Sequence, residues 1–238
     1  TRASTLSNKP GEGSIKSFDH LVYSKNNFYV ADNTSKKIFK VSLSSLNDKK
    51  EIASVDEEIT HIYHDGKTIH YSTKKKIYSY DWISEKSELS LDFKHGDIIS
   101  FAIINGNKYV LTKNGLYKYT AGNKPDGVLT SNQYKRMTSV QGGTKLYLLR
   151  EGYVDIVDTD IDIDIDKRPI IKKVALGALD ASKQVSMKTD SIGNIYLIEK
   201  SGKVTKIKDT SYTITKTQYD VKGTSVGSEP IFTDLAVS

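Results

Sequence analysis

The sequence predicts an all-β propeller built from four-stranded antiparallel blades, and three observations support this fold class. A short strand with a central aromatic residue recurs about every 40 residues, a spacing typical of propeller blades. Tyr dominates the aromatic residues, with 15 Tyr against 6 Phe and 1 Trp, and this bias favours pleated strands. Turns rich in Gly and Asn separate the candidate strands. The central positions of the recurring strand are Tyr29, His70, Tyr109, Tyr147 and Tyr196.

The recurring strand is the second of four in each repeat. Each copy follows a Gly- or Asn-containing turn, as expected for a tight hairpin. A first strand precedes this turn and begins near positions 20, 61, 100, 137 and 185. Third strands are expected at 38–41, 77–80, 116–119, 154–157 and 204–207. Fourth strands with alternating polarity are expected at 51–55, 88–93, 127–131, 170–176 and 212–218.

This order of strands divides the chain into a flexible N-terminal segment, 1–16, and one propeller domain, 17–238. The final residues, 229–238, align with the first strand of the first repeat and predict the first strand of a partial sixth blade. Because the first repeat already has its own inner strand, we expect further residues and a complete ring of six or more blades. Five complete blades are expected at about 17–56, 57–97, 98–133, 134–178 and 183–221.

Residues 28–42, FYVADNTSKKIFKVS, resemble the NHL and YWTD-type propeller repeats. Units of those repeats read as an apolar-Tyr-Val-small-Asp segment, a short turn and then Ile-x-x-Val. The resemblance covers the period and strand pattern of about 17–220 and implies the fold without implying a chemistry. It is strongest in the first copy, which has Asp32. Near the equivalent position the later copies have Thr73, Thr112, Arg150 and Lys200.

Composition excludes several kinds of site. The chain contains no Cys, which excludes disulfides, thiolate-bound zinc and thiol nucleophiles. Its formal net charge is +6, with 35 basic and 29 acidic residues. The Lys clusters fall in expected turns and few basic residues are Arg, so nucleic-acid binding is disfavoured. No apolar run reaches the ~18 residues of a membrane span. The lack of Cys and the Lys-, Asn- and Tyr-rich character favour an extracellular or particle-surface location.

An acidic segment follows the third strand of the fourth repeat. In an extended strand its Asp residues share one face and its Ile residues share the other. Such a ladder could coordinate Ca²⁺ through carboxylate oxygens. The favoured alternative is an edge strand whose charges prevent edge-to-edge aggregation, because Ca²⁺ loops need a turning backbone. The candidate ligands are Asp158, Asp160, Asp162, Asp164 and Asp166.

A second candidate site lies at the mouth of the central channel. His20 and His61 occupy equivalent positions on adjacent inner strands, and Asp19 precedes His20. Imidazole and carboxylate groups are suitable ligands for Zn²⁺. His70 replaces the recurring Tyr and is interpreted as a packing residue. Further residues expected on the channel side are Thr60, Arg136 and Lys188.

The sequence therefore favours a non-catalytic propeller that acts as a protein-binding or structural module of a larger assembly or surface protein. No acid pair, Ser nucleophile elbow or HExxH helix is recognised, so no catalytic residue is assigned. The alternative is a metal-dependent propeller hydrolase or lyase with its site at the channel mouth. The expected partner is a protein or larger assembly, with a glycan as a further option. No cofactor is expected beyond the Ca²⁺ and Zn²⁺ alternatives.

Overall fold

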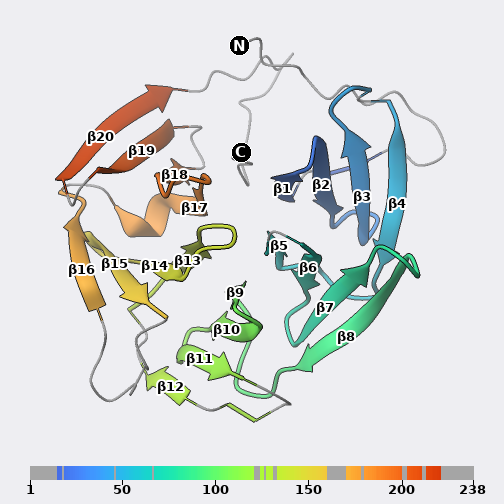
Figure 1. Ribbon diagram of the computed structural model, residues 1–238, viewed down its shortest axis with the longest axis horizontal. Helices are drawn as coiled ribbons and strands as arrows, with labels where there is room; N and C mark the ends of the chain where they lie inside the picture. The colour runs from blue at the N-terminus through green and yellow to red at the C-terminus, as the bar shows by residue number, and fades with distance from the viewer. Residues whose placement is uncertain are drawn as a thin grey trace.

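The computed structural model describes residues 15–17, 19–45, 47–65, 67–120, 124–125, 127–130, 133–159, 170–177, 180–199, 203–210 and 213–220. These residues form 20 strands and one short 3-10 helix, η2 (Ala181–Lys183). The strands form five separate four-stranded antiparallel sheets arranged around a central axis, as Figure 1 shows. The predicted propeller fold and its five complete blades are confirmed.

Each blade uses four strands that are consecutive in the sequence. Blade 1 contains β1 (His20–Ser24), β2 (Asn27–Asp32), β3 (Lys37–Ser42) and β4 (Lys49–Ser54). Blade 2 contains β5 (His61–His64), β6 (Ile69–Ser72), β7 (Lys76–Asp81) and β8 (Lys86–Asp92). Blade 3 contains β9 (Ser100–Ile104), β10 (Asn107–Leu111), β11 (Gly115–Tyr119) and β12 (Gly127–Thr130). Blade 4 contains β13 (Arg136–Ser139), β14 (Lys145–Arg150), β15 (Tyr153–Asp158) and β16 (Ile170–Ala175). Blade 5 contains β17 (Gln184–Thr189), β18 (Ile195–Glu199), β19 (Lys203–Thr210) and β20 (Thr213–Asp220).

The first strand of every blade lies nearest the central axis and the fourth lies at the periphery (Figure 1). Neighbouring inner strands contact one another in the order β1, β5, β9, β13 and β17. This arrangement brings the starts of five strands, far apart in the sequence, to one central region. The predicted partial sixth blade, 229–238, lies outside the described residues, as does most of the predicted N-terminal segment.

Tight turns between the first and second strands set the register of the blades. In blade 1 the turn residues Lys25 and Asn26 have φ values of 47° and 60°. In blade 3 the equivalent Asn105 and Gly106 have φ values of 50° and 80°. Two consecutive residues with positive φ are the hallmark of the primed turns that match the twist of a hairpin. The Asn- and Gly-rich turns recognised in the sequence therefore have a defined conformational role.

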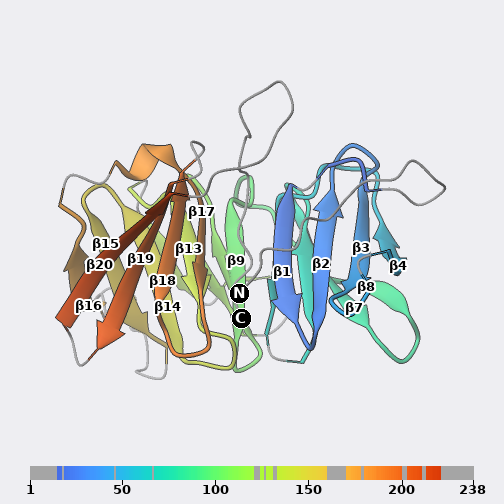
Figure 2. The ribbon, with the colours of Figure 1, turned by 90° about the horizontal axis from the view of Figure 1, so that it is seen from above.

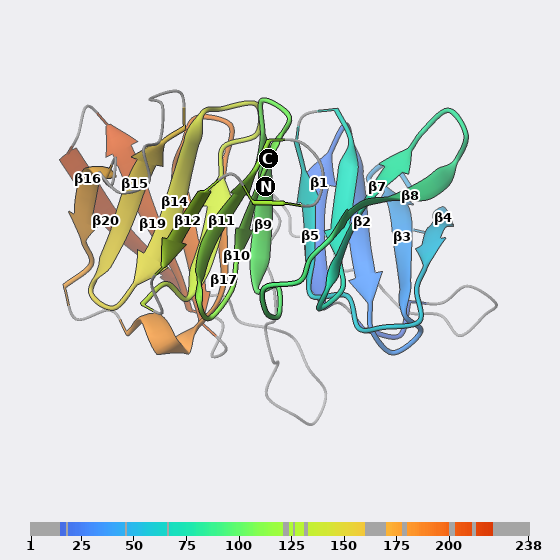
Figure 3. The same ribbon diagram turned by 90° about the horizontal axis from the view of Figure 1, so that it is seen from below.

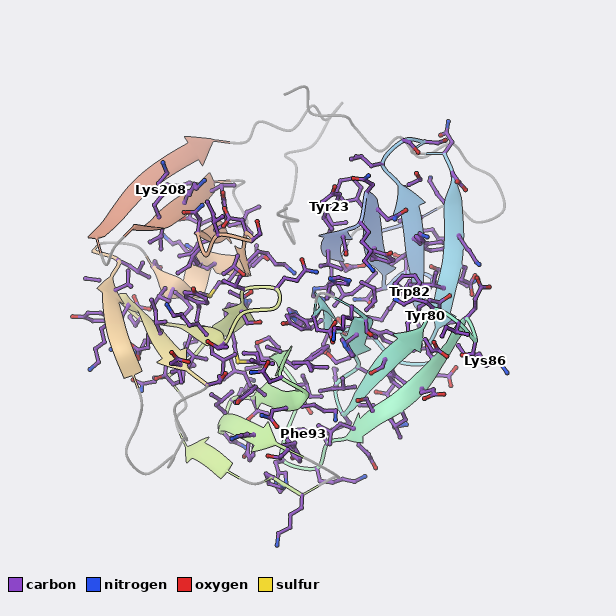
Figure 4. All side chains as sticks on the ribbon, viewed as in Figure 1. Tyr23, Tyr80, Trp82, Lys86, Phe93 and Lys208 are labelled. Atoms are coloured by element: carbon purple, nitrogen blue, oxygen red, sulfur yellow. The ribbon has the colours of Figure 1, made fainter. Side chains whose placement is uncertain are left out.

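The hydrophobic core lies between neighbouring blades. Tyr29 of blade 1 contacts Trp82 of blade 2, with ring centroids 5.6 Å apart, and Tyr80 packs against the same indole at 4.9 Å. Figure 4 shows Tyr80 and Trp82 together and Lys86 pointing outward from the periphery. Phe93 packs edge-on against Tyr117 of blade 3 at 5.3 Å. Stacking one sheet on the next thus buries the apolar side chains that a single blade would expose.

The propeller is a disc with two chemically different faces. Because successive strands are antiparallel, the turns joining first to second and third to fourth strands lie on one face, which we call the turn face. The inner strands begin on the opposite face, which we call the mouth face. In Figure 3 the turn face, with the β7–β8 hairpin, is at the top, and the mouth face, with η2, is at the bottom. In Figure 2 the mouth face is at the top. No helix among the described residues is long and apolar enough to cross a membrane.

Candidate functional site

The starts of the inner strands surround a cavity of about 150 Å³ at the mouth face of the central channel. Each of the five blades contributes to its wall. The contributing side chains include His20 of β1, His61 of β5, Ser100 of β9, Arg136 of β13 and Lys188 of β17. Of the residues expected on the channel side, His20, Thr60, His61, Arg136 and Lys188 line this cavity.

His20 and His61 meet at this cavity. Their ring centroids are 6.4 Å apart and the rings are close to perpendicular. His61 also packs edge-on against Phe101, at 5.4 Å. Burial lowers the pKa of His61 well below its usual value, and the nearby Lys188, His20 and Arg136 lower it further. His61 is therefore neutral at pH 7, beside two side chains that are positively charged.

Asp19, the third residue of the predicted metal site, makes contacts within blade 1. Its Oδ2 atom accepts a hydrogen bond from the backbone N–H of Asn33 at 2.8 Å and another from the hydroxyl of Ser17. The structure thus brings the two imidazoles together and places this carboxylate at a turn. Within the described part of the chain, no group of three or more His, Asp or Glu side chains is positioned to hold a metal ion.

The predicted acidic ladder is described only at its first residue. Asp158 is the last residue of β15. The other four candidate ligands, Asp160, Asp162, Asp164 and Asp166, lie outside the described residues. A Ca²⁺ site on this segment therefore stays a prediction.

The two other histidines of blade 2 bind different partners. His64 is buried between blades, with Nε2 3.0 Å from Ser24 Oγ of blade 1 and Nδ1 in contact with Gln141 Nε2 of blade 4. His70 lies 3.1 Å from Asp65 Oδ2 and 2.8 Å from Ser79 Oγ within its own blade. The buried position of His70 agrees with its interpretation as a packing residue.

Burial lowers the pKa of His64 to about 4. The nearby Asp65 raises this pKa, whereas Lys25 and His70 lower it further. With the Gln141 amide in the observed orientation, Nδ1 accepts a hydrogen bond and Nε2 donates one to Ser24. A proton on Nδ1 would remove the acceptor for Gln141. His64 is therefore a neutral connector between three blades.

Further polar connectors lie on the inner strands. The hydroxyl of Tyr63 in blade 2 is 2.8 Å from that of Ser139 in blade 4. Thr189 of blade 5 donates to the carbonyl oxygen of Ser139 at 2.6 Å. Sequence reasoning missed these links, because no local pattern indicates a partner in another repeat. Together these hydrogen bonds connect the inner strands of different blades and fix the blades relative to one another.

Blade 4 contains a buried ion pair near the mouth face. Arg150 Nε donates to Asp155 Oδ2 at 2.7 Å, and the hydroxyl of Tyr134 donates to the same oxygen at 3.0 Å. The Asp155 side chain is 1% exposed. The hydrogen bond to Asp155 raises the pKa of Arg150, so the guanidinium remains charged. Arg150 is one of the residues that replaces the Asp of the first repeat, and its carboxylate partner compensates for that replacement.

Asp32, the residue that carries the repeat resemblance, has a structural role. Its buried carboxylate accepts hydrogen bonds from Lys16 N at 2.7 Å, Ser17 Oγ at 2.8 Å and Ser35 N at 3.1 Å. Burial opposes ionisation, but these hydrogen bonds outweigh it and lower the pKa of Asp32. In blade 3, Thr112 accepts from Asn114 N at 3.0 Å at the equivalent turn. The same turn is thus stabilised by different chemistry in different blades.

The turn face differs from the channel mouth in exposing apolar side chains. Ile83, in the turn between β7 and β8, is 95% exposed, and Ile192, between β17 and β18, is 78% exposed. Leu43, which follows β3, is 43% exposed. Ile192 also borders a hollow of about 320 Å³ between blades 4 and 5, which Lys145 and Tyr147 help to line.

Comparisons with known proteins support the fold. No protein-family model matches the chain, and no curated protein sequence matches it. Virginiamycin B lyase from Staphylococcus aureus is 11% identical with a TM-score of 0.59, covering 84% of this chain and 69% of that chain. A chain of the nidogen/laminin complex is 13% identical with a TM-score of 0.65, covering 87% and 81%.

A third similar structure belongs to a much longer chain. PorZ, a surface component of the type-IX secretion system of Porphyromonas gingivalis, is 13% identical with a TM-score of 0.51. The match covers 84% of this chain and 28% of PorZ. At these identities the similarities show the fold and no shared activity. At the level of fold, the chain is a β-propeller, and it resembles the NHL and YWTD-type propellers.

Proposed function

We propose that this propeller is a non-catalytic binding module of a larger assembly or surface protein, and that it recognises a protein partner through its turn face. The observation that carries this proposal is that three of the five exposed large apolar side chains among the described residues, including the two most exposed, lie in turns of that face. Ile83, Ile192 and Leu43 have this position in three different blades. Exposed apolar side chains on a rigid scaffold are typical anchors for a protein partner.

Two further features support this function. The inner-strand connectors, such as the contact of His64 with Ser24 and Gln141, hold the blades in fixed relative positions. A fixed framework lowers the entropic cost when several turns contact one partner together. The hollow beside Ile192 offers a recess that could receive a partner side chain.

The similar structures agree with a binding role without establishing it. One comes from a complex of two proteins, nidogen and laminin, and another is a bacterial surface component, PorZ. We accordingly infer an extracellular or particle-surface location for this propeller. The partner is proposed to be a protein, and a glycan is the less favoured option because the turn face displays aliphatic side chains.

Affinity capture from the natural source tests this function. The unmodified chain should capture a defined partner. A variant carrying both Ile83→Asp and Ile192→Asp should capture it at least about tenfold more weakly, because each substitution would place a charged carboxylate in the buried interface. The matched control is Leu89→Asp, on the outer strand β8, where Leu89 is 55% exposed. Equal capture by the double variant, or no captured protein at all, would contradict the proposal.

The second candidate is a metal-dependent hydrolase or lyase at the channel mouth, favoured by the contact between His20 and His61. The positive charges of Arg136 and Lys188 in the same cavity oppose the binding of a cation. A melting curve recorded with and without Zn²⁺ or Ca²⁺ distinguishes the two candidates, because an ion that binds only the folded state raises the melting temperature. The binding-module proposal predicts that neither ion raises the melting temperature by binding to the channel residues.

A further inference from the structure

We propose that a cavity between blades 1 and 2 binds one neutral sugar ring, with a hexose as the defining example. The cavity has a volume of about 210 Å³ and is lined by residues at the end of β4 and by residues of blade 2. Its wall includes the turn between β6 and β7, which lies on the mouth face. The proposal goes beyond partner binding, because the exposed anchors lie on the opposite face. The two sites can therefore be tested separately.

A buried hydroxyl of the wall has no partner. Thr73, in the turn after β6, lines the cavity and is 1% exposed, and its Oγ1 atom makes no hydrogen bond with any described residue. A buried polar atom in this state is costly and uncommon in native proteins. A ligand hydroxyl in the cavity can donate a hydrogen bond to this oxygen or accept one from it.

The equivalent residue of blade 3 shows that the turn itself does not require an unpaired hydroxyl. Thr112 follows β10 as Thr73 follows β6, and each backbone N–H donates to the carbonyl oxygen three residues later at 2.9 Å. The Thr112 hydroxyl accepts from Asn114 N at 3.0 Å and donates to the carbonyl oxygen of Gly115 at 3.3 Å. The Thr73 hydroxyl makes neither of these bonds. Blade 2 therefore leaves for a ligand a group that blade 3 uses within its own turn.

The charged side chains of the wall favour a neutral ligand with several hydroxyls. Asp56 and Glu57, which follow β4, are exposed, and Lys76 is the first residue of β7. Within the part of the chain that the structure describes, none of these three side chains forms an ion pair. The carboxylates accept hydrogen bonds and the ammonium group donates them. A sugar hydroxyl takes both roles, whereas a ligand with a single charge is repelled by one of the two kinds of group.

Two tyrosine rings provide the apolar part of the wall. Tyr71 and Tyr78 lie on neighbouring strands of blade 2, with ring centroids 5.1 Å apart and an angle of 16° between the ring planes. Tyr71 is buried, Tyr78 is half-buried, and both line the cavity. The C–H groups on one face of a sugar ring are apolar and pack on aromatic surface. Because stacking already fixes the two rings, a ligand does not have to order them.

The size of the cavity limits the ligand to one ring. Its volume of about 210 Å³ compares with about 30 Å³ for one water in the liquid. This space suits a monosaccharide. The second ring of a disaccharide would lie outside the cavity, in solvent.

Titration with glucose, galactose and mannose, followed by ligand-observed NMR and by melting curves, tests the proposal. At least one hexose should bind with a Kd of about 1 mM, as expected for a small site with few polar contacts. That hexose should also raise the melting temperature more than an equal concentration of glycerol, which has hydroxyls but no ring. Its affinity should not change with ionic strength, because the ligand carries no charge.

The variant Thr73→Val removes the unpaired hydroxyl and keeps the shape of the side chain. It should weaken hexose binding about 3- to 10-fold, as expected for one neutral hydrogen bond. It should not lower the melting temperature, because no hydrogen bond within the chain is lost. Thr112→Val is the matched control and should behave in the opposite way, lowering the melting temperature and leaving hexose affinity unchanged. Unchanged hexose affinity in Thr73→Val, or an equal loss of affinity in both variants, would overturn the proposal.

A second variant keeps the proposal testable if Thr73→Val fails to fold. The double variant Asp56→Asn, Glu57→Gln changes two exposed side chains and should weaken hexose binding about tenfold, because charged hydrogen bonds are roughly twice as strong as neutral ones. Glu58→Gln is its control, because Glu58 is exposed next to them and is outside the cavity. No binding of any of the three hexoses, or binding of methylammonium in their place, would overturn the proposal. Partner capture through the turn face is a separate measurement and is not expected to change in these variants.

Discussion

The turn face and the mouth face are formed by opposite ends of the same strands, yet they differ in chemistry. Turns on the first face expose Ile83 and Ile192, whereas the opposite strand ends gather Arg136 and Lys188 around a cavity. Hydrogen bonds within the sheets fix the strands but leave the residues at their ends free to vary. A regular repeat can therefore carry different side chains on its two faces.

The two faces differ in how deeply their characteristic side chains are buried, and therefore in how much those side chains contribute to stability. The mouth side contains the buried Arg150–Asp155 pair, while the side chains that characterise the turn face are surrounded by solvent. We therefore expect substitutions on the mouth side to reduce stability strongly and substitutions at the exposed turns to change it little.

The largest effect is expected for Arg150→Met. This substitution leaves Asp155 as a buried carboxylate without its cation, and removing one partner of a buried pair costs about 3–5 kcal/mol. Urea unfolding at pH 7 measures the loss. The control is Lys37→Met, because the exposed Lys37–Glu51 pair has the same N–O distance of 2.7 Å. Loss of this exposed pair should cost less than about 1 kcal/mol. Equal losses of unfolding free energy in Arg150→Met and Lys37→Met would show that burial does not make the Arg150–Asp155 pair more important for stability.

Acid should weaken the centre of the ring through His64. Its pKa is about 4 in the folded chain and near 6.5 when unfolded, so the unfolded chain binds the proton first. The stability associated with neutral His64 is present above pH 6.5 and is lost as the pH falls toward 4. The upper limit is about 3 kcal/mol. His61, whose pKa is also lowered, contributes with the same sign.

The variant His64→Gln isolates this effect. The difference in unfolding free energy between pH 7 and pH 4.5 should be smaller in His64→Gln than in the unmodified chain. His95→Gln, at an exposed histidine, serves as the control and should retain the full difference. If His64→Gln retained the same pH dependence as the control, His64 would not be the buried neutral connector described above.

The smallest effect is expected on the turn face. Ile83→Asp and Ile192→Asp should each change the free energy of unfolding by no more than about 0.5 kcal/mol, because neither side chain is part of the core. Urea unfolding of the isolated variants checks this. A loss above about 1 kcal/mol at either position would mean that the side chain packs within the folded chain and is not an anchor for a partner.

Much of the fold could be predicted because its signals are local. The recurring strands around Tyr29 and Tyr109, and turns such as Asn105-Gly106, depend on neighbours in the sequence, and the structure contains each of them. From the period we expected His20, His61 and Arg136 on the channel side, and all three line the cavity at its mouth. Equivalent positions in successive blades face the same axis, so this much of the candidate site follows from the repeat alone.

The remaining features depend on contacts between distant residues. Gln141 reaches His64 across the channel, and the two are 77 positions apart. Asp155 compensates for Arg150 at a site where the first repeat has Asp32. The carboxylate of Asp19 could point to the channel or to its own turn, and only the hydrogen bond from Asn33 N distinguishes these possibilities. No sequence period specifies such pairings.

Partner capture and urea unfolding, measured on the same variants, test most directly whether the two faces have different roles. Both would be measured for the Ile83→Asp, Ile192→Asp double variant and for Arg150→Met. We predict that the double variant loses the partner and keeps its free energy of unfolding, while Arg150→Met loses stability and, where it remains folded, keeps the partner. A large loss of stability in the double variant, or loss of the partner only in folded Arg150→Met, would contradict this division between the faces.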